Sequence, residues 1–436
     1  MKRIALLLFL TALFLPGLKT ARAQDDSPLV LVLTADGPLT PAMREYLKRA
    51  IDIAEQRGAE ALILQLNTPG GSIDLMTEMV QVMRASPVPV VVYVTPNGAM
   101  AGSAGTVITL AGHAAAMSPE TMIGAASPVG SQGEDLGEAL DKKIKEATKA
   151  LTRSLAERRG AEAVELAEST IDDAIAVSAS EALEAGLVDF IATDLDDLLA
   201  QLDGFTVKMA EGEHTLETTG AVTEDLPMSF VEQLLDILVN PNIVFLLVTI
   251  GVQAILIELS SPGGWAAGFT GLSCLALAAY GLGVLPVNWF GALFILASFV
   301  LFVLDVKAPT HGALTTAGIG SFILGALVLF NSPGVPQFQR VSVPLVIGVG
   351  IITGILFALV VGFAIRAQRV PISVGLESMV HKTGIARTDI NPTGQLQAGS
   401  ELWTAELAEG AEPVRAGESV EIVEIRGMRL RVRKLG

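Results

Sequence analysis

The chain has 436 residues, enough for two or three folded units, and with 51% hydrophobic and 17% charged residues it is too apolar for one ordinary soluble domain. The formal net charge is −17, and residues 24–230 hold 13 basic against 33 acidic side chains, hence −20. Such an acidic region argues against nucleic-acid binding there. The single cysteine, Cys274, excludes an intrachain disulfide and lies in an apolar run, where a packing role is expected.

The first residues have the pattern of a secretory signal peptide. Met1-Lys2-Arg3 is positively charged, residues 4–14 are apolar, and Ala21-Arg22-Ala23 forms a small-x-small cleavage site. We expect cleavage after Ala23, with an uncleaved anchor helix as the alternative. In both cases the residues that follow are exported.

Strand and helix patterns alternate over residues 28–208. The continuous β-branched run at 88–94 is typical of a strand that is covered on both faces. Repeated strand–helix units predict an α/β domain with a mostly parallel sheet and helices packed on it. The expected strands include 29–33, 61–66 and 88–94, and the expected helices include 42–56, 73–84, 103–111, 140–158 and a short one within 180–189.

The second half of the chain is dominated by apolar segments that predict a helical bundle of four or five membrane spans. An odd number of spans places the C-terminus in the cytoplasm, and Lys307, Arg366 and Arg369 agree with that side, whereas Arg340 does not. Four spans would place the C-terminus outside. The segments are 243–259, 265–285, 290–304, 312–330 and 344–365.

The C-terminal residues predict a small β-domain. Five short strand-like runs fit a five-stranded barrel of OB type. Trp403 is its one aromatic residue, so the stacking platform used for single-stranded nucleic acid is absent, and a protein-interaction or assembly module is expected. The expected organisation is a signal peptide at 1–23, an α/β domain at 24–208, a linker at 209–240, a membrane region at 241–366 and the barrel at 373–436.

A glycine turn and a serine suggest a hydrolase site. Gly70 and Gly71 follow a buried strand, where their backbone can turn sharply and present amides to an oxyanion, although most such turns only connect elements. Ser103 stands among small residues at a helix start, where a substrate backbone can approach and the helix dipole favours negative charge. An N-cap serine is the alternative interpretation.

A serine nucleophile needs a base, and the four histidines are poor candidates. His113 follows the serine helix closely and is expected to be structural, while His214 lies in the linker and His311 and His381 lie in or beyond the membrane region. A lysine whose pKa is lowered by burial can replace histidine. The candidates are Lys142, Lys143, Lys145 and Lys149, and helical periodicity does not choose among them.

The turn at 67–71, the serine segment at 98–105 and the element at 180–189 resemble the membrane-bound NfeD proteases of the Clp protease/crotonase fold group. The resemblance covers nearly the whole chain and matches the long form of that family. It implies a Clp/crotonase-like protease domain and a C-terminal OB domain. It also implies a Ser–Lys dyad with Ser103 as nucleophile, and oxyanion amides from Gly71 and Ala104.

The resemblance also selects a lysine. Arg153-Ser154-Leu155-Ala156 is similar to the segment that follows the family's catalytic lysine, and counting back ten residues reaches Lys143, which is 40 residues after Ser103. Lys142 and Lys145 remain alternatives. Clp proteases carry a histidine in the segment that here reads 125–128, and its absence agrees with a lysine base.

The expectation is therefore a membrane-anchored serine endopeptidase of the bacterial inner membrane, without cofactor or metal, whose protease domain forms a homo-oligomer. The resemblance implies a stomatin-like membrane protein as substrate or partner, cleaved in a hydrophobic stretch. A non-proteolytic membrane scaffold that organises such a partner is the alternative. A crotonase-type acyl-CoA enzyme is disfavoured, because its substrates are intracellular and this domain is exported.

Overall fold

The computed structural model describes residues 27–128, 138–260, 265–307, 310, 312–332, 335, 339–368 and 379–435. The predicted signal peptide at 1–23 and residues 373–378 of the predicted C-terminal domain lie outside these residues.

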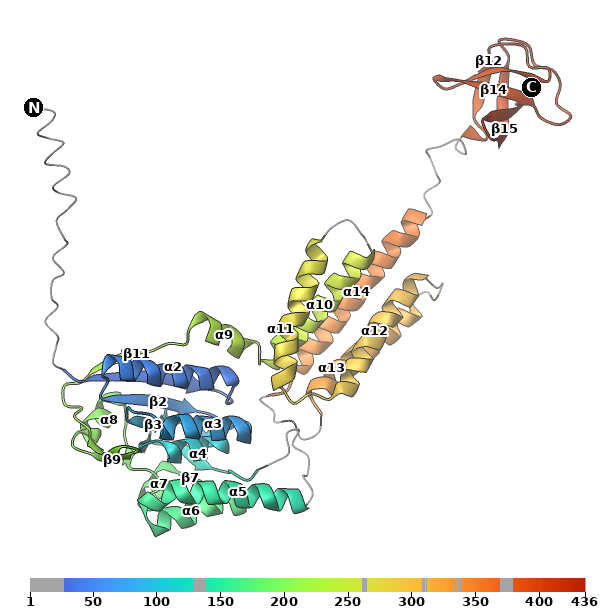
Figure 1. Ribbon diagram of the computed structural model, residues 1–436. Coiled ribbons are helices and arrows are strands. Elements are labelled where there is room, and N and C mark those ends of the chain that lie inside the picture. The colour runs from blue at the N-terminus through green and yellow to red at the C-terminus, as the bar shows by residue number, and fades with distance from the viewer. Residues whose placement is uncertain are drawn as a thin grey trace, which may run out of the picture. The chain divides into compact units, whose positions relative to one another are not determined.

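The N-terminal part is built on a parallel six-stranded sheet, as the alternating pattern predicts (Figure 1). Every neighbouring pair in it is parallel. A second, three-stranded sheet has the order β4-β6-β7. The six strands, in their order across the sheet, are β11 (Val222–Asp225), β1 (Leu29–Asp36), β2 (Ala61–Asn67), β3 (Val90–Val94), β5 (Ala114–Met117) and β8 (Phe190–Ile191). The smaller sheet consists of β4 (Met100–Gly102), β6 (Met122–Gly124) and β7 (Ala176–Ser178).

Both faces of the large sheet are covered, because alternate residues of its strands enter two separate cores. On β3, Val92 packs with the helices of one face, and Val91 and Tyr93 pack with the other layer. This explains the continuous apolar run in the sequence. One face carries α2 (Pro41–Arg57), α3 (Ile73–Arg84) and α4 (Ala104–Ala111), and the other carries α8 (Leu195–Leu202) and the hairpin of β9 (Thr206–Met209) and β10 (Gly212–Thr215). Further helices are α5 (Glu138–Ala156), the 3-10 turn η1 (Glu157–Arg159), α6 (Ala161–Asp172) and α7 (Ala179–Glu184).

The structure differs from the sequence expectation most clearly at residues 209–240, which were expected to be a linker. They hold β10, β11 and the short helix α9 (Phe230–Ile237). Strand β11 pairs with β1 and completes the edge of the main sheet. All four residues of β11 are exposed and two are acidic, so the strand carries no apolar signal. The boundary of the α/β unit therefore lies beyond residue 208.

Five apolar helices follow in the described part of the chain, in agreement with the upper count of predicted spans. Three of them are long and apolar enough to cross a membrane by the length and composition of their described residues. The helices are α10 (Pro241–Ser260), α11 (Ala266–Val284), α12 (Trp289–Lys307), α13 (Ala313–Phe330) and α14 (Val343–Gln368).

Glycines allow close packing in two helix pairs. A Cβ on Gly271 would lie 2.8 Å from the carbonyl oxygen of Gly251, and a Cβ on Gly325 would lie 2.9 Å from that of Gly291. Helices α10 and α11, and likewise α12 and α13, thus approach through backbone contacts, as is usual for membrane helices.

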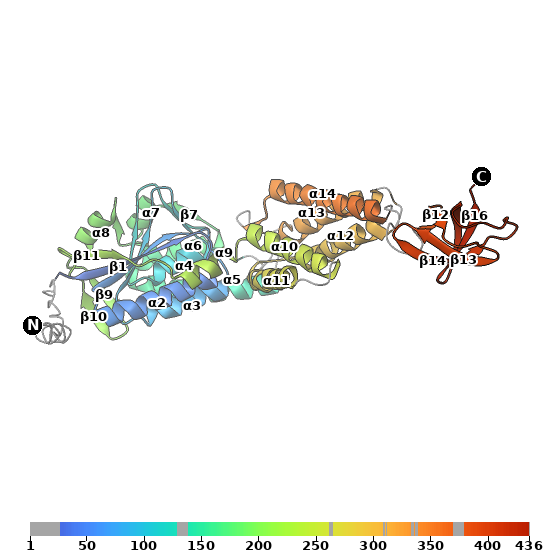
Figure 2. The same ribbon diagram turned by 90° about the horizontal axis from the view of Figure 1, so that it is seen from above.

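The C-terminal part is a closed barrel with the strand order β12-β13-β14-β16-β15 (Figure 2). The predicted count of five strands is confirmed. Leu396, Ile422 and Leu430 are among the fully buried residues that fill its core. Its strands are β12 (Thr383–Ala386), β13 (Thr393–Ala398), β14 (Glu401–Leu407), β15 (Ser419–Arg426) and β16 (Arg429–Lys434).

Candidate active site

Ser103 occupies the junction between β4 and α4 in a backbone conformation that is rare for a non-glycine residue. Its φ is 53° and its ψ is −120°, and its amide donates to the carbonyl of Gly124 at 2.9 Å. Although it is the N-cap residue of α4, its side chain makes no capping hydrogen bond. The hydroxyl is therefore not used as an ordinary helix cap, and a strained serine of this kind indicates a functional position.

The glycine turn lies directly against this serine. The Thr68 amide donates to the Met100 carbonyl at 2.7 Å, and the Gly102 amide donates to the Thr68 carbonyl at 2.9 Å, so the turn runs beside β4. Gly70 has a φ of 114°, and a Cβ built on it would stand 2.7 Å from Cβ and 3.1 Å from Oγ of Ser103. Only glycine allows this approach.

Two backbone amides, one on the glycine turn and one at the start of α4, are the predicted oxyanion donors. Within the described residues, neither the Gly71 amide nor the Ala104 amide donates a hydrogen bond. Ala104 is the first residue of α4, where no intrahelical acceptor exists. Gly71 is held in place because the Leu39 amide donates to the Gly70 carbonyl at 2.9 Å and the Leu39 side chain packs on Gly71. The structure thus brings the turn that carries Gly71 to Ser103 and Ala104.

Lys143 is not part of this cluster in the structure. It lies on α5, and its side chain is exposed, as is that of Lys142. Across the described residues, no hydrogen bond joins Lys143 to Ser103. Lys149 forms an ion pair away from Ser103, since its Nζ donates a hydrogen bond to Asp172. Residues 129–137, which precede α5, lie outside the described part of the chain.

Three of the four histidines lie in the described part of the chain, and each has a partner other than Ser103. His113 is buried, and its Nδ1 accepts a hydrogen bond from the Val90 amide at 3.0 Å. Burial, together with the positive charges of Arg84 and Arg158, lowers the pKa of His113 to about 3. His214 pairs with Glu60, in the α/β part, at 2.9 Å. His311 lies outside the described residues, and His381 contacts Glu421 in the C-terminal barrel.

Buried His113 is expected to make stability depend on pH. Its folded-state pKa lies below the unfolded value of 6.5, so between these values the unfolded chain binds more protons and stability falls as pH falls. Between pH 7 and pH 5 this residue alone should remove about 2 kcal/mol of unfolding free energy. Thermal unfolding of the full chain at both pH values measures the loss. His113→Gln keeps an acceptor for the Val90 amide, so the fall in unfolding free energy between pH 7 and pH 5 should be smaller in this variant by about 2 kcal/mol. An equal fall in the wild-type chain and the variant would show that His113 is not its cause.

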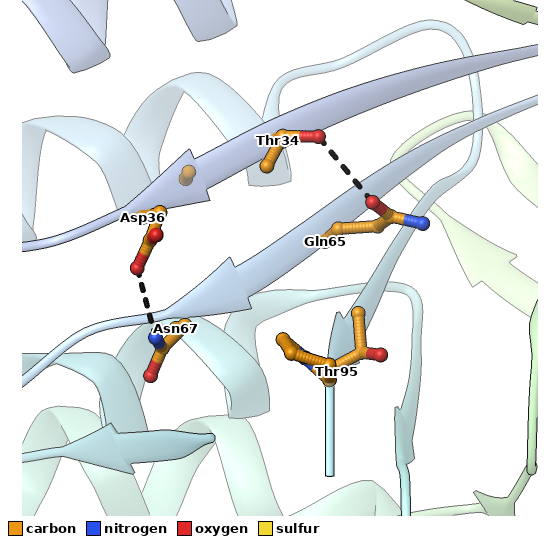
Figure 3. A pocket seen from close by; sticks show the side chains of 7 residues that line it. Thr34, Asp36, Gln65, Asn67 and Thr95 are labelled. Atoms are coloured by element: carbon orange, nitrogen blue, oxygen red, sulfur yellow. Dashed lines mark hydrogen bonds between the residues drawn. The ribbon is translucent and has the colours of Figure 1, made fainter. Parts of the chain in front are cut away.

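A polar hollow of about 300 Å³ lies at the carboxyl ends of β1, β2 and β3 (Figure 3). Asn67 links it to the serine strand, because its Nδ2 donates to Asp36 Oδ1 at 2.8 Å while its Oδ1 accepts from the Met100 amide at 3.1 Å. Thr34, Gln65 and Thr95 complete the labelled lining. The hollow was missed from the sequence, although each of its residues lies at or just beyond a strand end.

Within the described residues, no group of three His, Cys, Asp or Glu side chains is arranged to hold a metal ion.

Comparisons with known proteins identify the family of the chain. Family models match residues 30–211 (NfeD1b, N-terminal domain), 242–362 (NfeD integral membrane domain) and 376–434 (NfeD-like C-terminal, partner-binding domain). The membrane-bound protease PH1510 of Pyrococcus horikoshii is 34% identical over 411 residues, which is 92% of each chain. The membrane protein NfeD1b of Bacillus subtilis is 27% identical over 439 residues, covering 95% of this chain and 94% of that one.

Among solved structures, the chain is similar to the 1510-N membrane protease specific for a stomatin homolog from Pyrococcus horikoshii. The identity is 32% with a TM-score of 0.42, over 48% of this chain and 98% of that one. Three consecutive family domains and a relative matched along nearly its whole length lead to one conclusion. The chain belongs to the NfeD family, in the long form that joins an N-terminal NfeD1b domain, an integral membrane domain and a C-terminal partner-binding domain.

Proposed function

We propose that this protein is a membrane-anchored serine endopeptidase with Ser103 as nucleophile and Lys143 as general base. The neutral Lys143 amine takes the Ser103 proton, and Oγ attacks the carbonyl carbon of the substrate. The Gly71 and Ala104 amides hold the resulting oxyanion. When the intermediate collapses, the lysine returns the proton to the leaving amine, and water then hydrolyses the acyl-serine by the same route in reverse. No cofactor takes part.

One observation carries the proposal: a serine at φ 53° whose hydroxyl is not used as a helix cap and against which a glycine turn is packed. A turn that only connects elements does not need a contact so close that Gly70 admits no side chain. The exposed position of Lys143 adds a requirement. The first turns of α5 must approach the serine when substrate binds, since catalytic hydrogen bonds often tighten only in the complex.

Trapping the acyl-enzyme tests this function. The full chain in detergent is mixed with an apolar peptide ester, quenched in acid, digested and examined by mass spectrometry. The acyl group is expected on the peptide that contains Ser103, and it should be absent from Ser103→Ala. Cleavage that continues in Ser103→Ala would refute the nucleophile. Absence of both turnover and acylation in the wild-type chain would favour the scaffold function.

The proposed substrate or partner is a stomatin-like membrane protein, cleaved in an apolar segment. Two findings support it: a similar protease is described as specific for a stomatin homolog, and the C-terminal residues match a partner-binding domain. A homo-oligomer of the protease domain is part of the same proposal.

The proposed topology follows from the number of apolar helices. Five spans, an odd number, put the protease domain and the barrel on opposite sides of the membrane. With a signal peptide at 1–23, the protease domain is exported and the barrel is cytoplasmic. A reporter fused after Gly436, active on only one side of the membrane, shows whether the C-terminus is cytoplasmic. Activity on the outer side contradicts this orientation.

A further inference from the structure

Helix α9 leaves an apolar face uncovered just before the first membrane helix. Phe230, Val231 and Ile237 are 79%, 61% and 54% exposed, and Leu234 is also exposed. At 100° per residue these four positions fall on one side of the helix. Four large apolar side chains on one short exposed surface indicate that something covers them.

The opposite side of α9 is fixed to the α/β domain. Glu232, which is 7% exposed, receives hydrogen bonds of 2.7 and 2.8 Å from the Arg49 guanidinium. Burial alone raises the pKa of Glu232, but the hydrogen bonds from Arg49 and Ser229 outweigh it and leave the pKa below its ordinary value. Thr40 Oγ1 donates to Asp236 Oδ1 at 2.8 Å. Both carboxylates of α9 therefore point to α2, and the helix cannot turn its apolar side inward.

The residues that connect α9 to α10 indicate what covers the apolar face of α9. Only three residues separate Ile237 from Pro241, the first residue of α10. Within that joint, Leu238 is buried, and a Cβ on Gly281, near the end of α11, would lie 2.3 Å from its carbonyl oxygen. Helix α9 is thus attached where α10 begins and α11 ends. That is the level of the membrane–water interface, where amphipathic helices lie flat.

We propose that α9 is an interfacial helix that seats the protease domain on the lipid surface, with Phe230, Val231, Leu234 and Ile237 in the bilayer. The acidic charge of the domain does not oppose this contact at α9, because Glu232 and Asp236 are neutralised by partners or turned toward α2. The proposal concerns the membrane contact alone and holds whether or not Ser103 is a nucleophile.

The docked helix also sets which part of the domain faces the lipid. Asp236 contacts Thr40 at the start of α2, whereas Arg57 at the other end of α2 pairs with Glu224 on the edge strand. The residue before Thr40, Leu39, holds the Gly70 carbonyl. The proposed seating of α9 therefore turns the glycine turn and the carboxyl edge of the sheet toward the bilayer.

Fluorescence quenching in vesicles tests the proposal. The full chain is reconstituted into phosphatidylcholine–phosphatidylglycerol vesicles after Cys274→Ala removes its single cysteine. Val231→Cys on the apolar side and Gln233→Cys on the polar side carry the same fluorophore, and both positions are exposed. Acyl-chain-brominated lipid is expected to quench the label at position 231 at least threefold more than the label at 233, and aqueous iodide should show the opposite preference.

Other outcomes overturn the proposal. Equal quenching of both labels by iodide means that the apolar face is in water. Shielding of the label at position 231 from both iodide and brominated lipid, increasing with the protein-to-lipid ratio, means that a second copy of the chain covers it.

Discussion

Lys143→Ala is expected to lower the rate of peptide cleavage by the full chain about a thousandfold or more, as much as Ser103→Ala. A nucleophile and its base act as one unit, so removal of either should cost about the same, and the double variant should be no worse than either single one. Lys143→Arg should remain inactive, because a guanidinium is not deprotonated near neutral pH. Cleavage rates at saturating and at limiting peptide measure these losses.

Alanine variants of the neighbouring lysines provide the controls. Lys142→Ala and Lys149→Ala should keep activity within a few-fold, since the register taken from Arg153 selects Lys143 over Lys142 and Lys149 is paired with Asp172. If Lys145→Ala is the one lysine variant whose cleavage rate falls as far as that of Ser103→Ala, the base is Lys145 and the register taken from Arg153 is wrong. If no lysine variant loses activity while Ser103→Ala does, the dyad itself is refuted.

Gly70→Ala is expected to reduce the rate of cleavage by about a hundredfold or more while the chain still folds. The added Cβ would stand 2.7 Å from Ser103 Cβ, so the serine or the glycine turn must move. A displacement of about 1 Å at a nucleophile can reduce the rate by about a hundredfold, and the oxyanion amides move with the turn. The measurement pairs cleavage rate with thermal unfolding of the same sample.

Gly98→Ala is the matched control for Gly70→Ala. Gly98 also has a positive φ, 83°, but nothing lies within 4 Å of a Cβ built there. It should lose about 1 kcal/mol of stability from backbone strain and keep its activity. If the two variants lose activity equally, the effect comes from strain in general and the turn has no special contact with the serine.

Much of the fold follows from local patterns. The helix predicted at 73–84 coincides with α3, and the strands predicted at 61–66 and 88–94 coincide with β2 and β3 to within two residues at each end. The five apolar helices match the predicted segments, and the barrel has the predicted count of five strands. Composition and periodicity act within a single element, so they can be recognised without knowledge of its neighbours.

The candidate site was only partly predictable. Gly70, Gly71 and Ser103 stood out because small residues cluster around them. The sequence could not show that the turn packs on Ser103, because the hydrogen bonds that unite them join residues about 30 positions apart. The hollow around Asp36 and Asn67 could not be predicted from the sequence for the same reason. Lys143 was selected by family resemblance, and among the described residues no hydrogen bond to Ser103 supports that choice independently.

The sequence by itself determined the class of the protein: an acidic α/β domain, a membrane region and a small barrel, with a serine and paired glycines at chain positions suited to acyl transfer. Only the tertiary structure showed the strained φ of Ser103, the place of β11 at the sheet edge and the orientation of α9. These features depend on contacts between distant segments, such as Arg49 with Glu232, 183 residues apart. The polar edge strand β11 leaves no apolar signal in the chain, and the amphipathic pattern of α9 does not show which side of the helix packs on α2.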